Sequence, residues 1–136
     1  MNEARYSHSA TMLSNGNVFI VGGYDINDNP ITSTEVYISS TNTWLTVASM
    51  SIIRLYHTAT ILTNGNVLIV GGQNTNGVAL ASSELYDPSA NTWQTVASMN
   101  VARSLHTATI LSNGKLLVTG GYTGISINSV ELYDPL

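Results

Sequence analysis

Cysteine is absent from this chain of 136 residues, and charged side chains make up only 9% of it. Without cysteine, a disulfide framework and thiolate metal sites are excluded. The four cations, Arg5, Arg54, Arg103 and Lys115, are too few and too scattered to follow a phosphate backbone, so we expect no nucleic-acid binding. Apolar runs such as "VLIV" at 67–70 are too short to cross a bilayer, so we expect no membrane insertion.

What the sequence does contain is a long repeat. The string "RYSHSATMLSNGNVFIVGG" begins at Arg5, "RLYHTATILTNGNVLIVGG" at Arg54 and "RSLHTATILSNGKLLVTGG" at Arg103, so the copies are 49 residues apart. Tyr86 follows Tyr37 after 49 residues, but Tyr133 follows Tyr86 after only 47. Repeats of this length are typical of arrays of small structural units.

Each copy reads as a series of short strands. "HTATIL" ends at an Asn-Gly hairpin turn, and "NVLIVGG" has no polar alternation, which indicates a strand buried on both faces. A polar segment follows, then "SELYD" and "NTWQTVASM" as third and fourth strands. We therefore predict an all-β chain of three four-stranded antiparallel propeller blades, at about 1–50, 51–99 and 100–136, with the last blade lacking its fourth strand.

The recurring landmarks resemble the kelch repeat. They are Arg-x-x-His-x-Ala-x-x-Leu-x-Asn-Gly, then Gly-Gly, Glu-x-Tyr-Asp-Pro, Asn-x-Trp and Met, and they cover essentially the whole chain. Copy one departs at Ile38-Ser39-Ser40, where Asp-Pro is expected. The resemblance implies a partial kelch β-propeller over 1–136, acting as a non-enzymatic binding scaffold for a protein, peptide or glycan, without a cofactor.

A competing hypothesis is a fragment of a kelch-propeller enzyme, such as a galactose-oxidase-like oxidase or a sialic-acid-epimerase-like protein. "RYSHSATMLSNG" is similar to the galactose oxidase segment that supplies a copper-binding histidine, here His8. That copper site also needs tyrosine ligands and a cysteine crosslinked to one of them. This chain has no cysteine. Since three equally spaced histidines also favour repeat packing, we predict no metal site and no enzyme activity.

Three blades do not close a propeller, which typically has about 4–8 blades. Two hypotheses follow: the chain is a fragment of a longer kelch protein, or two copies assemble into a six-bladed ring. We favour the fragment, because Pro135-Leu136 is an abrupt end for a domain. The Ser-, Thr- and Asn-rich composition with little lysine favours an extracellular setting, and the compartment itself is not determined by the sequence.

Antiparallel strand order places the arginines, histidines, glycine pairs and variable segments at one end of the blades. The candidate binding residues at this end are Arg5, His8, Tyr24, Asp25, Asp28, Arg54, His57, Gln73, Asn74, Arg103, His106 and Tyr122. For the arginines, we favour internal pairing with the repeat glutamates over ligand binding. The residues expected to be structural are Gly22, Gly23, Glu35, Tyr37, Trp44, Gly71, Gly72, Glu84, Tyr86, Trp93, Gly120, Gly121, Glu131 and Tyr133.

Overall fold

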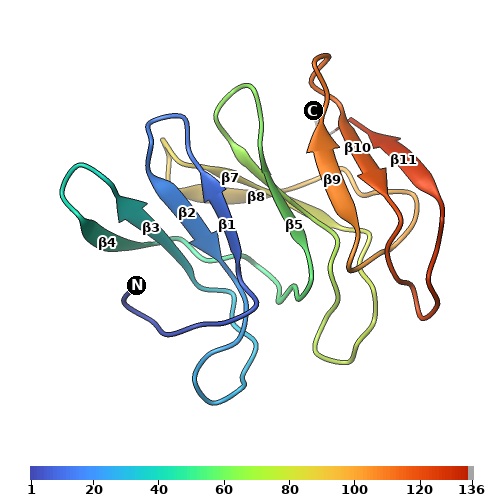
Figure 1. Cartoon of the computed structure of the whole chain (residues 1–136), viewed down its shortest axis with the longest axis horizontal. Helices are drawn as coiled ribbons and strands as arrows, with labels where there is room; N and C mark the ends of the chain where they lie inside the picture. Colours follow the sequence, from blue (N-terminus) through green and yellow to red (C-terminus); the bar gives the residue numbers. More distant parts are fainter. Residues whose placement is uncertain (135–136) are drawn as a thin grey trace.

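A computed structural model describes residues 1–134 as three antiparallel sheets without a helix (Figure 1). The first sheet holds β1 (Ser9–Met12), β2 (Val18–Val21), β3 (Thr34–Ile38) and β4 (Thr43–Val47). The second holds β5 (Thr58–Ile61), β6 (Val67–Val70), β7 (Ser83–Asp87) and β8 (Thr92–Val96). The third holds β9 (Thr107–Ile110), β10 (Leu116–Thr119) and β11 (Val130–Tyr133). The predicted all-β fold of three blades, the last one incomplete, is confirmed.

Within each blade the strands are in sequence order, each paired antiparallel with the next. The innermost strands β1, β5 and β9 lie side by side across the middle of Figure 1. This order divides the molecule into two ends. The hairpin end carries the short β1–β2, β5–β6 and β9–β10 turns, and the loop end carries the longer β2–β3, β6–β7 and β10–β11 loops together with the links between blades.

The core lies between the blades rather than inside any one of them. Phe19 and Val21 of β2 pack against Val67 and Ile69 of β6 in the first interface. In the second, Leu68 and Val70 on the other face of β6 pack against blade three. The run "VLIV" is therefore buried on both faces, because alternate side chains enter different interfaces.

The outer aromatic side chains belong to the same packing. Trp93 contacts the rings of Phe19 and Tyr86, and its indole N–H donates to the Ala48 carbonyl of the preceding blade at 2.7 Å. Tyr86 donates to Asn91 Oδ1 at 3.0 Å, which fixes the β7–β8 turn. Trp93 thus packs into the interface between blades one and two and also donates a hydrogen bond across it.

Two further findings concern the described part of the chain. The last two residues of the third predicted blade, Pro135 and Leu136, lie outside the described residues. Residues 1–134 contain no helix of the length and apolarity needed to cross a bilayer.

Candidate binding face

Each repeat arginine is buried at the loop end and hydrogen-bonded within its own blade. Arg54 donates from Nη1 to the carbonyls of Gly71 and Ser82, at 3.1 and 2.6 Å, and from Nε to Glu84 at 3.1 Å. Arg5 binds Gly22, Ser33 and Glu35 through Nη1 and Nη2 in a similar way. Arg103 donates to the carbonyls of Gly120 and Ser129 and forms an ion pair with Glu131 at 3.8 Å. The glycine pairs end the second strands with carbonyls that the arginines bind.

The repeat glutamates complete these networks. Glu35 accepts hydrogen bonds from the backbone N–H groups of Asn2 and Glu3 as well as from Arg5. Burial raises the pKa of Glu35, but these donors outweigh it and hold the pKa below its ordinary value. Glu84 and Glu131 likewise accept from the backbone N–H groups of Ser51 and Asn100. The arginine–glutamate pairs therefore fix the links between blades. Their charges are paired with each other inside the protein.

Two of the three histidines join neighbouring blades. His57 Nδ1 donates to the Arg54 carbonyl at 2.8 Å, so its Nε2 accepts from the Ser9 hydroxyl of blade one, also at 2.8 Å. His106 Nε2 forms the equivalent hydrogen bond with the Thr58 hydroxyl of blade two at 3.0 Å. Burial first, and then the nearby guanidinium groups, lower the pKa of both histidines to about 4. They are neutral bridges at physiological pH.

In blades one and two, the second residue after the glycine pair shapes the variable loop. Asp25 accepts from the backbone N–H groups of Asn27 and Asn29, both at 2.8 Å. The hydrogen bonds from Asn29 lower the pKa of Asp25. Asn74 holds the second loop in the same way, accepting from Asn76 and Val78 at 3.0 Å. Both side chains are turned into their own loops.

Three tyrosines from two blades gather at the loop end, and we call Tyr6, Tyr24 and Tyr56 the tyrosine patch. The rings of Tyr6 and Tyr24 stack with centroids 5.1 Å apart and an interplanar angle of 14°. The Tyr6 hydroxyl donates to Asp28 at 2.9 Å, and this hydrogen bond raises the pKa of Tyr6. Partial burial and the adjacent Tyr56 hydroxyl raise the pKa of Tyr24. The patch is thus both exposed and held in place by its own contacts.

Tyr56 occupies a strained position that recurs in each blade. Ser7, Tyr56 and Leu105 all have φ near +55°, and all three side chains are exposed. Non-glycine residues at such angles cost about 1–2 kcal/mol each and persist only where surrounding contacts enforce them. At Leu105 the backbone N–H donates to the Tyr56 carbonyl at 3.1 Å, which ties two of these positions together. The repeat therefore presents one exposed side chain per blade, and its identity changes from copy to copy.

Polar contacts beneath the surface link the residues that follow the glycine pairs of blades two and three. Gln73 and Tyr122 occupy the position of Tyr24 in the other copies, directly after the glycine pair. Ser104 lies between them, with its hydroxyl 3.4 Å from Gln73 Oε1 and from the Tyr122 carbonyl. Of the predicted binding residues at the loop end, Asp28 and Tyr122 are exposed and Tyr24 and Gln73 are half-buried, whereas the arginines, His57 and His106 are buried.

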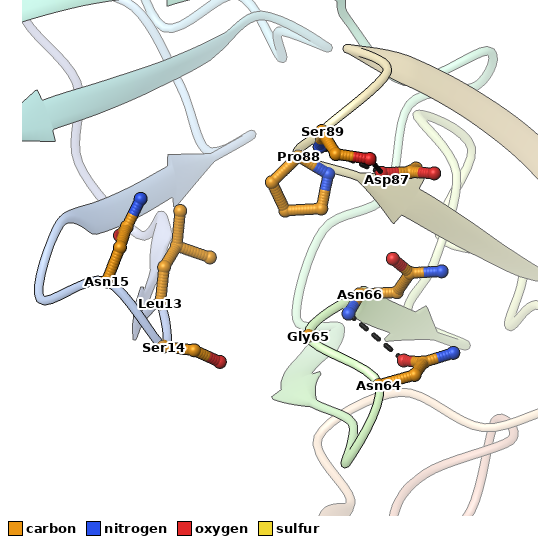
Figure 2. Close-up of a pocket in the computed structure, with 9 residues that line it drawn as sticks. All are labelled: Leu13, Ser14, Asn15, Asn64, Gly65, Asn66, Asp87, Pro88 and Ser89. Carbon is orange, nitrogen blue, oxygen red and sulfur yellow. Dashed lines mark hydrogen bonds between the residues drawn. The ribbon is translucent and has the colours of Figure 1, made fainter.

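The hairpin end contains a shallow hollow between blades one and two (Figure 2). Leu13, Ser14 and Asn15 line one side, and Figure 2 shows the β5–β6 turn and Asp87-Pro88-Ser89 across from them. The polar groups here close their own turns: Asn64 accepts from the Asn66 N–H at 3.1 Å, and Asp87 accepts from Ser89. This hollow offers a ligand few free polar groups, so the loop end is the stronger candidate.

Within residues 1–134, no group of three or more His, Asp or Glu side chains is arranged to hold a metal ion. Sequence reasoning concentrated on the variable loops and missed Tyr6, Tyr56, Ser104 and Leu105. A signal was present, because "RYSH", "RLYH" and "RSLH" differ only between a constant arginine and a constant histidine.

The sequence profile of the kelch motif matches the chain three times, at residues 5–51, 54–100 and 102–136. A search among curated proteins finds no match for the chain. The three profile matches coincide with the three sheets and with the repeated arginine, glycine-pair and glutamate network described above. By its repeats and by its fold, the chain belongs to the kelch-motif family.

Proposed function

We propose that this chain is a non-enzymatic scaffold whose loop end binds a polypeptide partner. Kelch repeats commonly serve in protein interaction. The observation that carries the proposal is the tyrosine patch, in which side chains from two blades are exposed and already ordered. Tyrosine gives a large contact area with a polar end, and a preformed patch loses little conformational entropy on binding.

The surroundings of the patch support an uncharged or weakly basic partner. Exposed apolar side chains occupy the loop end in all three blades, at Ile26, Val78, Leu105 and Ile125. The arginines are buried, while Asp28 is exposed beside Tyr6. Apolar and aromatic side chains around a small acidic group suit a peptide segment with aliphatic residues and an occasional lysine or arginine.

The test is selection of binders from a displayed random-peptide library on the immobilised chain. Truncating central aromatic anchors costs about 2 kcal/mol, roughly thirtyfold in Kd, so enriched peptides should bind the Tyr6→Ala/Tyr56→Ala variant that much more weakly. Leu45→Ala is the control, because Leu45 is a similarly exposed side chain on β4, away from the loop end.

Equal affinity for wild type and the tyrosine variant would contradict the proposed site. Hits on a glycan array, in the absence of any peptide enrichment, would contradict the polypeptide partner and indicate that the same rings stack on sugars.

A further inference from the structure

The two outer blade faces carry the two halves of an interface that the chain already contains twice. Blade two meets blade one through Val67, Ile69 and Tyr86, and it meets blade three through Leu68, Val70 and Leu85. The 49-residue repeat places the counterparts of the first set on the outer face of blade one, at Val18, Ile20 and Tyr37. The counterparts of the second set are Leu117, Thr119 and Leu132, on the outer face of blade three.

The outer faces are uncovered at their margins, although Ile20 on the outer face of blade one is itself buried at 5% exposure. Leu132 is 53% exposed, whereas its counterpart Leu85 is 2% exposed. Met1 is 47% exposed, whereas its counterparts Met50 and Met99, which each lie in an interface between blades, are both 4% exposed. Leu132 and Met1 therefore differ from their counterparts in the covered interfaces by the absence of a blade packed against them.

The hydrogen bonds that join neighbouring blades lead to the same conclusion. His57 reaches back to Ser9 and His106 to Thr58, each 48 residues earlier, and within residues 1–134 His8 and Thr107 are the two residues of this series without such a partner. These two residues lie on opposite outer blades of one chain, and the Thr107 hydroxyl bonds instead to Thr119 at 2.8 Å. His8 of one copy and Thr107 of a second copy therefore carry the two matching halves of such a bridge.

The surroundings of the glycine pairs are a third observation that the outer face of blade three lacks a neighbouring blade. A Cβ on Gly22 would lie 3.2 Å from His57 Cε1, and one on Gly71 would lie 2.9 Å from His106 Cε1, because the next blade covers each strand end. At Gly120 the nearest such atom is the Ile127 carbonyl oxygen, 3.6 Å away and in the same blade. The strand end at Gly120 has the shape that receives a histidine of a following blade.

From these observations we propose that the outer face of blade three binds the outer face of blade one of a second copy. His8 and Met1 of one copy then cover Gly120 and Thr107 of the other, as His57 and Met50 cover Gly22 and Ser9 within the chain. Two such head-to-tail contacts, related by a twofold axis, close a ring of six blades.

The mass of the purified wild-type chain is the first test. Sedimentation velocity and light scattering should give twice the chain mass of 14.5 kDa, with no larger species. A monomer at every concentration would overturn the proposal and leave these faces to other blades or another protein. A ladder of larger oligomers would also overturn it, because the head-to-tail contact would then not close after two copies.

Variants on each face test the head-to-tail geometry. Met12 is 69% exposed on the outer face of blade one, so Met12→Lys and Leu132→Asp each place a charge in the proposed contact with little effect on the single chain. Each variant alone should be monomeric. The matched control is Leu45→Asp, because Leu45 is 54% exposed but lies on the other face of blade one, and this variant should remain dimeric.

Mixing the two variants distinguishes this geometry from a face that pairs with itself. Met12→Lys retains an intact blade-three face and Leu132→Asp an intact blade-one face, so an equimolar mixture should form a heterodimer through one undamaged contact. No association on mixing, or a dimer of either variant alone, would overturn the proposal. The tyrosine patch lies at the loop end, so peptide binding by a chain that stays monomeric would leave the proposed function standing.

Discussion

Among single residues, Gly71 gives the sharpest test of how the blades pack. A Cβ at this position would lie 2.5 Å from the Arg103 carbonyl oxygen, and φ is +61°. At Gly77 φ is +75°, but nothing lies within 4 Å. Gly77→Ala should therefore cost only backbone strain, about 1–2 kcal/mol, and Gly71→Ala about 1–3 kcal/mol more from the clash. Urea unfolding of both variants measures the difference, and equal losses would show that the close approach is unimportant.

The structural residues that could be predicted from the sequence are those that have the same role in every copy of the repeat. The glycine pairs, arginines and glutamates recur because each blade must end a strand, bind its carbonyls and fix the next link. Tyr6 and Tyr56 escaped prediction because they occupy different positions in their copies. They become neighbours only through the curvature of the array and the left-handed backbone at Tyr56, which no spacing in the sequence reveals.

Among the strands, the joints between β1, β5 and β9 should be sensitive to acid. The pKa of His57 and of His106 is lowered to about 4 in the folded chain, against an ordinary value of 6.5. The unfolded chain therefore binds protons first, and stability should fall as the pH drops from about 6.5 to about 4. The loss should reach about 3 kcal/mol for each histidine, because burial, and then the nearby arginine, disfavours the charged ring in the folded chain.

Urea unfolding at a series of pH values measures this loss, with His57→Gln/His106→Gln as the comparison. The double variant should lose less stability than wild type across the same range, because its amides do not titrate. Identical pH dependence of the two proteins would assign the acid sensitivity to the carboxylates instead.

The strands also show what an apolar run in the sequence leaves undetermined. The runs in β2, β6 and β10 are equivalent and all predict strands buried on both faces. Only β6 is buried along its whole length, whereas buried and half-buried residues alternate along β10. Strand identity follows from the residues, but burial depends on whether a blade follows, and a single copy of the repeat carries no information about that.

For the whole array of three blades, assembly should be visible in thermal stability. If the outer faces close a two-copy ring, unfolding separates the copies, and the melting temperature rises with protein concentration by mass action. Each tenfold increase in concentration contributes about 1.4 kcal/mol per dimer. Leu132→Asp should melt at a temperature independent of concentration, because its uncovered face no longer accepts a second copy. A wild-type melting temperature that is constant over a hundredfold concentration range would mean that the fold of each chain is maintained by its two internal interfaces alone.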